Sequence, residues 1–152
     1  MLGRMYTAGF EAIAVSAVQD LFQLLAASNV AVIVHEVRFS QVTVEVSEMV
    51  ELMMHRGSTN GSGGGTDTPN PNDMSLPAAD TTVEINNTTQ ATNGTLVGFR
   101  KEVWQMVHPF LWLPPPEGRV LIPGGDLFHV SLETAPDAET TMSGAILFEE
   151  LG

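Results

Sequence analysis

Val30–Arg56, with the sequence VAVIVHEVRFSQVTVEVSEMVELMMHR, decides the fold that this chain predicts. Its first run, Val30–Phe39, opens with apolar residues and then alternates apolar with charged residues. Its second run, Val42–Met54, places apolar residues at most alternate positions, with threonine, glutamate and serine between them. β-Branched side chains and a period of two are typical of strands with one face toward water. We interpret the two runs as the central antiparallel strands of a β-sandwich.

The length and composition predict one globular domain covering residues 1–152. The chain has 152 residues, 43% of them hydrophobic, and a chain of this size buries roughly two-thirds of its unfolded surface. No stretch approaches the ~20 apolar residues of a membrane span. No secretory signal is visible at the N-terminus, and with no cysteine the sequence fits folding in a reducing cytosol. We expect a soluble protein without a membrane partner.

The charge is strongly acidic, with a formal net charge of −12 from 18 acids and 6 bases. A nucleic-acid-binding surface needs clustered basic side chains to displace phosphate counterions. The basic residues here are scattered along the chain. Nucleic acid is therefore an unfavourable partner.

Residues 10–25 leave two interpretations open. Apolar residues from Phe10 to Leu25 fall at helical spacing, which read alone indicates an amphipathic helix. The alternative is two short strands, Phe10–Val15 and Leu21–Ala26, that turn near Gln19 and Asp20. The strand-rich remainder of the chain favours the second interpretation.

Residues 57–79 have a different composition. This stretch is rich in Gly, Ser, Thr, Asn and Pro and has almost nothing to bury. Such a composition predicts a long exposed loop within the domain rather than a linker between domains. A loop of this length in a compact domain is usually functional or mobile.

The second half of the chain predicts further short strands separated by Gly and Pro. Phe128, Val130 and Leu132 alternate with His129 and Ser131. The expected segments are Thr81–Asn86, Leu96–Val107, Arg119–Ile122, Leu127–Glu133 and Thr141–Glu149, the last with Met142, Ile146 and Phe148 on one face. Together with the N-terminal half they predict an all-β, mainly antiparallel sandwich.

No catalytic, cofactor-binding or metal-binding residues are predicted. The histidines, at positions 35, 55, 108 and 129, are never paired at metal-ligand spacing. Asp126 and His129 could form an acid–base pair with Ser131 or Ser143 as the nucleophile. The chain lacks a Gly-x-Ser-x-Gly elbow, however, and scattered Ser, His and Asp are common. We expect a binding and structural protein rather than an enzyme, with this hydrolase as the alternative.

Apolar surface beyond the needs of one sandwich core predicts a protein–protein interface. Bulky groups stand on both faces of Leu96–Val107, and an apolar segment follows that ends in consecutive prolines. The interface candidates are Trp104, Met106, Phe110, Trp112, Pro114, Pro115 and Pro116. An alternative function is a carbohydrate-binding module in which Trp104 and Trp112 are stacking platforms.

Taken as a set, several segments resemble small virion proteins encoded beside the capsid genes of tailed bacteriophages. The resemblance covers most of the chain outside residues 57–79 and has no catalytic signature. It is carried by FEAIAV (Phe10–Val15), VQDLFQL (Val18–Leu24), HEVRFSQ (His35–Gln41), MMHRGS (Met53–Ser58), NNTTQ (Asn86–Gln90) and TMSGAILFEE (Thr141–Glu150).

The resemblance implies a jelly-roll-like sandwich that decorates or cements a capsid, commonly as a homotrimer. The implied partners are further copies of the chain and the major capsid protein. The implied location is the outer surface of the virion, assembled in the host cytoplasm. A tail- or fibre-associated protein is the alternative. The apolar run Val30–Val34 and the methionines at 49, 53 and 54 depart from the pattern.

Overall fold

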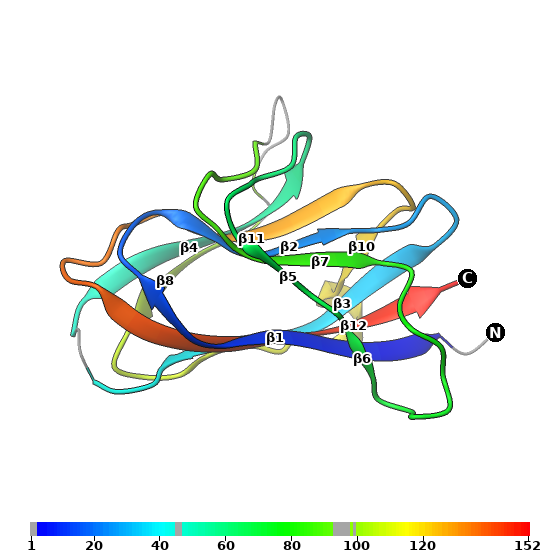
Figure 1. The fold of residues 1–152 in the computed structure, drawn as a ribbon, viewed down its shortest axis with the longest axis horizontal. Coiled ribbons are helices and arrows are strands. Elements are labelled where there is room, and N and C mark those ends of the chain that lie inside the picture. The colour runs from blue at the N-terminus through cyan, green and yellow to red at the C-terminus, as the bar shows by residue number, and fades with distance from the viewer. Residues whose placement is uncertain (1–2, 45–46, 93–97, 99) are drawn as a thin grey trace.

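The computed structural model describes residues 3–44, 47–92, 98 and 100–152, and these form two six-stranded antiparallel sheets packed as a sandwich (Figure 1). Sheet A contains β1 (Arg4–Val15), β3 (Ala31–Gln41), β6 (Asn70–Pro71), β9 (Phe110–Trp112), β10 (Val120–Ile122) and β12 (Thr140–Leu151). Sheet B contains β2 (Gln19–Leu25), β4 (Met49–Gly57), β5 (Gly65–Asp67), β7 (Thr82–Asn87), β8 (Arg100–Gln105) and β11 (Leu127–Leu132). Within the described ranges the only helical element is a 3-10 turn, Pro116–Gly118.

The order of the strands is that of a jelly roll. Sheet A runs β10-β3-β12-β1 and sheet B runs β2-β11-β4-β8, with β5, β6 and β7 added at the edges. Both β9 and β10 pair with β3, at Val37–Phe39 and Val32–Val34 respectively, so they share one position in the sheet. The consecutive prolines from Pro114 separate them, because proline cannot continue the hydrogen-bond ladder. Two sheets built from Greek keys in this order confirm the predicted all-β sandwich.

The two runs of Val30–Arg56 form strands, but the prediction that they pair with each other is wrong. β3 pairs with β12, β9 and β10 in sheet A, whereas β4 pairs with β11 and β8 in sheet B. The chain crosses between the sheets after Gln41, so Val42 and Val44 lie in a loop and are exposed. Val50, Leu52 and Met54 share the buried face, as their alternation predicts.

The ambiguous segment from Phe10 to Leu25 is two strands, as the second interpretation has it. They turn at Ser16–Val18, before Gln19 rather than at Gln19-Asp20, and they enter different sheets. β1 has a bulge at Ala12, which has a φ of 51°, and only Leu25 of β2 is not fully buried. A bulge and burial of both faces remove the period of two, which explains why the local pattern resembled a helix.

Residues 57–79 are not one exposed loop. This segment contributes β5 to the edge of sheet B and β6 to the edge of sheet A, so it fastens the two sheets together (Figure 1). Residues 58–64 and 88–92, which we call the cover, are joined to each other by the bridges Thr59–Thr92 and Ser62–Thr89. Much of the backbone is hydrogen-bonded, although most of its side chains are exposed.

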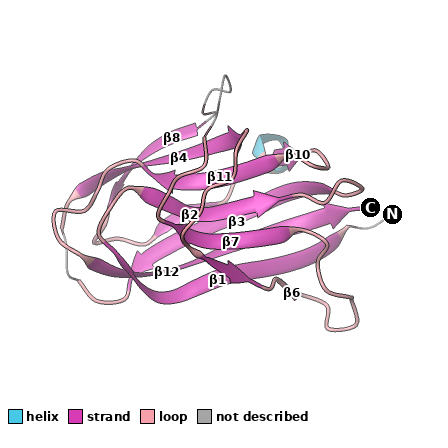
Figure 2. Ribbon diagram, turned by 45° about the horizontal axis from the view of Figure 1, so that its top comes forward, coloured by secondary structure: helices cyan, strands magenta, loops and turns pink. Residues whose placement is uncertain are grey.

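The core lies between the sheets, which face each other in Figure 2. The ring of Phe22 in sheet B stacks on Phe39 in sheet A with centroids 5.7 Å apart, and it lies tilted against Phe10 with centroids 5.3 Å apart. The expected inward residues of β11 (Phe128, Val130, Leu132) and of β12 (Met142, Ile146, Phe148) are all fully buried. Phe99, expected in the strand Leu96–Val107, lies outside the described residues.

Candidate functional sites: an open apolar face and a covered polar cluster

Most of the predicted interface residues lie in the core of the chain itself. Trp104, Met106 and Trp112 are 5%, 1% and 4% exposed. Pro114 is buried and Phe110 is half-buried, whereas Pro115 and Pro116 are exposed. The buried members pack across the sandwich: the Trp104 ring lies 6.5 Å from that of Phe39. Their apolar area is therefore used in folding and is not surplus, which corrects the expectation that they lie on the surface.

The same segment exposes different residues. Leu111 is 58% exposed and Leu113 is 62% exposed, and Leu121 on β10 is 50% exposed. Sequence reasoning missed these leucines because it favoured the larger aromatic side chains. The available signal was the alternation Leu111-Trp112-Leu113, in which a strand must turn one set of side chains outward.

These leucines border the outer face of sheet A. Leu121 lies opposite Ile33, and Leu111 lies opposite Arg38, both on β3. Other outward residues of this face are half-buried and mostly apolar or small, and we call the whole surface the open face: Met5, Thr7, Ala31, Ile33, Ala145, Leu147, Leu151, Leu111 and Leu121. All described strands belong to the two sheets, so no described strand forms a further layer over this face.

Four ionisable side chains of the open face lie in two close contacts. Arg38 Nε lies 3.6 Å from Glu36 Oε1, and His35 Nε2 lies 2.8 Å from Glu149 Oε2. Beside Leu111 an open groove of ≈ 580 Å³ is lined by Ser40, Ser143, Ala145 and the Phe110 side of β9. The exposed leucines and the groove give this face a ridge next to a depression.

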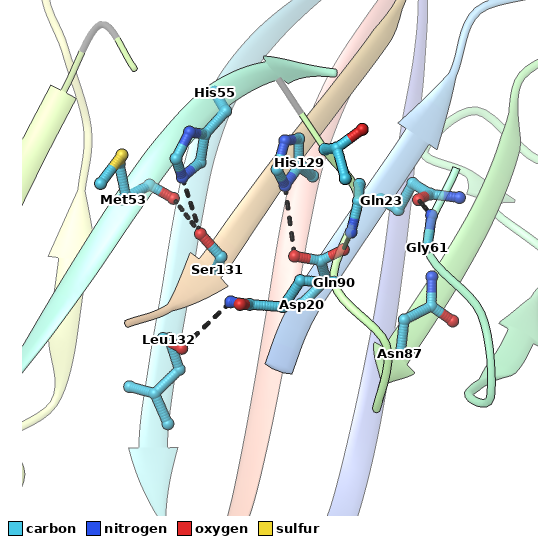
Figure 3. A network of polar contacts seen from close by, with 12 residues as sticks. Asp20, Gln23, Met53, His55, Gly61, Asn87, Gln90, His129, Ser131 and Leu132 are labelled. Carbon is cyan, nitrogen blue, oxygen red and sulfur yellow. Dashed lines mark hydrogen bonds and ion pairs between the residues drawn. The ribbon is translucent and has the colours of Figure 1, made fainter. Parts of the chain in front are cut away.

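The outer face of sheet B carries a buried polar cluster instead (Figure 3). Asp20 and Gln23 come from β2, His55 from β4, and His129 and Ser131 from β11, and each is at most 4% exposed. Strand pairing places His55 directly opposite His129. Polar side chains on the outer face of a sheet are usually solvated, so their burial here requires partners.

The cover supplies several of those partners. The Ala91 N–H donates to Asp20 Oδ2 at 2.6 Å, and the Gly61 N–H donates to Gln23 Oε1 at 2.7 Å. Asp20 Oδ1 lies 3.2 Å from His129 Nδ1. Gln90 Nε2 donates to the carbonyl of Leu132 at 3.3 Å. The cluster therefore holds a segment of the chain against the sheet through specific hydrogen bonds.

The two imidazoles of the cluster are stacked, with ring centroids 4.5 Å apart and planes 10° apart. His55 Nε2 lies 2.8 Å from Ser131 Oγ and 3.4 Å from Glu133 Oε1, and Ser131 donates a short hydrogen bond to Glu133. Burial lowers the pKa of His55, and the neighbouring His129 lowers that pKa further, against an opposing effect of Glu133. These effects favour the neutral form of His55.

The acid–base grouping of the alternative hydrolase hypothesis is not assembled. Asp126 is exposed in the turn before β11, and Ser143 lies on sheet A, whereas His129 lies on sheet B. Asp20, which sequence reasoning did not consider, is the carboxylate beside His129. Ser131 does lie in the cluster, but it is bonded to His55 and Glu133 and is 1% exposed. A substrate could reach it only if the cover moved.

The two tryptophans do not form exposed stacking platforms. Both indoles are at most 5% exposed, and Trp104 Nε1 donates to the carbonyl of His108 at 2.6 Å. Among the residues with described placement, no three His, Cys, Asp or Glu side chains come close enough together to hold a metal ion. No helix in the described ranges is long and apolar enough to cross a membrane.

Comparison with known proteins gives little. No protein-family model and no curated protein matches the chain. Among solved structures, it is similar to a chain of the infectious bursal virus-derived T=1 particles, at 16% identity and with a TM-score of 0.19. The similarity covers 97% of this chain but only 40% of that chain. A TM-score this low carries no argument about fold or function.

Proposed function

We propose that this protein is a structural component of a bacteriophage virion that decorates or cements the capsid by protein–protein contacts through its open face. One observation carries the proposal: the open face combines exposed leucines with the side-chain contacts Glu36–Arg38 and His35–Glu149. Leu111 and Leu121 are 58% and 50% exposed. A partner that covers the leucines of this face buries apolar area, and the two side-chain contacts reduce the cost of covering those four ionisable side chains.

The overall charge makes this arrangement significant. Each chain has a formal net charge of −12, so two copies repel each other over most of their surfaces. Association of copies therefore requires a contact in which the apolar contribution dominates, and the open face offers one. At roughly 25 cal/mol per Å², an apolar contact of about 1,000 Å² contributes a gross ~25 kcal/mol before association and ordering costs.

The strand order is compatible with a structural role in a viral capsid, but this fold also occurs in proteins with other functions. Jelly rolls occur in viral capsid proteins, lectins and cupins, and one fold hosts many functions. The trimeric state, the head location and the major capsid protein as partner come from the resemblance of the sequence. A tail- or fibre-associated component would use the same face. The burial of Trp104 and Trp112 removes the platforms that a carbohydrate-binding module needs.

The test has two parts. Sedimentation of the isolated chain across a salt series should show homo-oligomers that persist or strengthen as salt screens the repulsion. Leu111→Ser with Leu113→Ser and Leu121→Ser should give monomers, whereas Met74→Ser, at a position 96% exposed elsewhere, should not. Purified particles should contain the chain in a fixed ratio to the major shell protein. A monomer under all conditions, or particles without the chain, would contradict the proposal.

A further inference from the structure

A second exposed apolar surface lies at the end of the sandwich opposite the termini, at the left of Figure 1. The loops between β1 and β2, β3 and β4, β8 and β9, and β11 and β12 meet there. We call the described parts of these loops the tip. On it Val44 is 74% exposed, Val42 52%, Val18 40% and Val107 36%. None of these valines belongs to the open face.

Hydrogen bonds join the tip into one surface. The Val42 N–H donates to the carbonyl of Thr141 at 2.9 Å, and Thr141 pairs with Ala14 of β1. Gln41 Nε2 donates to the carbonyl of Met106 at 2.9 Å, which fixes the loop of Val107 beside that of Val42. The loops of Val42 and Val107 therefore lie side by side at this end of the sandwich, and exposed apolar area on a monomer can mark an interaction site.

The charges around these valines are of one sign. Glu48, Glu133, Asp137 and Glu139 lie in the loops of the tip, and these loops contain no lysine or arginine. The Asp137 N–H donates to Glu48 Oε1 at 2.8 Å, which ties two of the loops together. Among the described residues, Glu48, Asp137 and Glu139 have no ion pair with a basic side chain. Unlike the open face, the tip has a negative rim that is not neutralised.

The structure assigns the tip as a docking surface for a protein whose contact area has an apolar centre ringed by lysine or arginine. The valines supply the apolar centre, and the unpaired acids select a partner of opposite charge. The tip of a second copy would place acids against acids, and nucleic acid would be repelled. The inference adds a heterologous contact to the proposed structural role and does not require the open face to self-associate.

The probe is a synthetic peptide with a central Leu-Ile-Leu run flanked on each side by two lysines, which we call the lysine peptide. The control is the glutamate peptide, in which glutamates replace all four lysines. Fluorescence anisotropy should show that the lysine peptide binds, that salt weakens binding, and that the glutamate peptide does not bind. Val42→Ser with Val44→Ser should weaken binding at least tenfold. Asp137→Asn with Glu139→Gln should weaken it at least threefold.

Matched controls separate the tip from the general acidity of the chain. Met74→Ser removes an exposed apolar side chain elsewhere, and Glu117→Gln with Asp126→Asn makes the same charge change away from the tip. Both controls should leave the affinity within twofold of the wild type. Unfolding in urea should show that all variants are folded.

Three outcomes would overturn the assignment: no binding of the lysine peptide, equal weakening by tip and control charge changes, or tip variants that reduce self-association while peptide affinity stays unchanged. The last outcome would mean that the tip contacts another copy. The open-face triple serine variant separates the two proposals, because it should become monomeric and yet bind the peptide as the wild type does.

Discussion

On the outer face of sheet A, Leu111 and Leu121 are 58% and 50% exposed, whereas on the outer face of sheet B the side chains of Asp20 and His129 are 0% and 1% exposed. The two faces belong to one sandwich and share one core. On the uncovered face leucines are exposed, whereas on the covered face polar side chains are buried, although Val103 and Met49 of sheet B are also 61% and 55% exposed. This is the reverse of what a simple rule of hydrophobic burial would give for the two outer faces.

The comparison shows what holds each kind of surface in place. A segment of the same chain covers sheet B, and because the buried groups are polar it is held by hydrogen bonds with defined partners. Removing one partner there leaves another buried group unsatisfied, which costs more than the bond contributed. Nothing described covers the open face, so its residues contribute little to the stability of the monomer and are available to another chain.

The largest loss of stability is expected when the carboxylate of Asp20 is removed from the covered polar cluster. Asp20→Ala removes the acceptor of the Ala91 N–H and the partner of His129 together. The free energy of unfolding should fall by about 2–4 kcal/mol, because the Ala91 N–H and the His129 ring both lose a buried hydrogen-bond partner. Urea unfolding followed by circular dichroism measures the change.

Two controls accompany this variant. Asp20→Asn keeps an oxygen acceptor for the Ala91 N–H and should lose less stability than Asp20→Ala. Asp126→Asn changes an exposed acid and should stay within about 0.5 kcal/mol of the wild type. A loss below about 1 kcal/mol in Asp20→Ala would mean that the cover is not held by this cluster.

A smaller effect is expected where the cover meets the sheet. A Cβ at Gly61 would lie 2.7 Å from the carbonyl oxygen of Thr89 and 2.9 Å from Asp20 Oδ2. Gly61→Ala should therefore push the cover off the cluster and cost about 1–3 kcal/mol, as for overpacking of a filled site. At Gly65 the nearest atoms are 3.7 and 3.9 Å away, both from Ile85, so Gly65→Ala is the matched control. Equal effects at both positions would contradict the close contact.

Local pattern was enough to predict the strands and their inward faces, because alternation is a property of neighbouring residues. Phe128, Val130 and Leu132 were placed on the buried face of β11 in this way. Pairing was not predictable in the same way. Val30–Arg56 was expected to form one antiparallel pair, but its two halves are in opposite sheets. Which strand a segment joins depends on contacts that are distant along the chain.

The polar cluster could not be predicted from the sequence for the same reason. The carboxylate expected beside His129 was Asp126, which is near in sequence, but the actual partner is Asp20, 109 residues away. His55 and His129 become neighbours only through the register of β4 with β11. The segment Phe110–Pro116 is rich in apolar residues, but which of them face inward follows from the pairing of β9 with β3. That pairing buries Trp112 and exposes Leu111.

The covered face should also respond to pH. Burial and His129 lower the pKa of His55 in the folded state, so below the ordinary value near 6.5 the unfolded chain binds a proton that the folded chain does not. Stability should therefore be complete above that pH and should fall as the pH drops. His55 alone can contribute a slope of at most about 1.4 kcal/mol per pH unit. The groups that face the His55 ring are Glu133, His129 and Ser131, and Asp20 lies beside His129.

The measurement is urea unfolding of the wild type and of His55→Gln at pH 7.5 and pH 5.5. Glutamine can donate to Ser131 but does not titrate, so the variant should lose less stability than the wild type between the two conditions. Identical pH dependence in the two proteins would show that His55 is not held neutral by the cluster.

The smallest effect on the monomer is expected on the open face, where two adjacent residues of β10 give a direct comparison. Leu121 points outward and is 50% exposed, whereas Ile122 points into the core and is 3% exposed. Ile122→Ala should cost about 2–5 kcal/mol because it leaves a cavity, whereas Leu121→Ala should change the stability of the monomer by less than about 0.5 kcal/mol. Unfolding must be measured at low protein concentration, because the proposed association through the open face would stabilise the folded chain by mass action. In the wild type the urea midpoint should therefore rise with protein concentration, and in Leu121→Ala that rise should be smaller. If both proteins keep one midpoint at every concentration, the open face makes no contact between copies, and its leucines face a different partner or none.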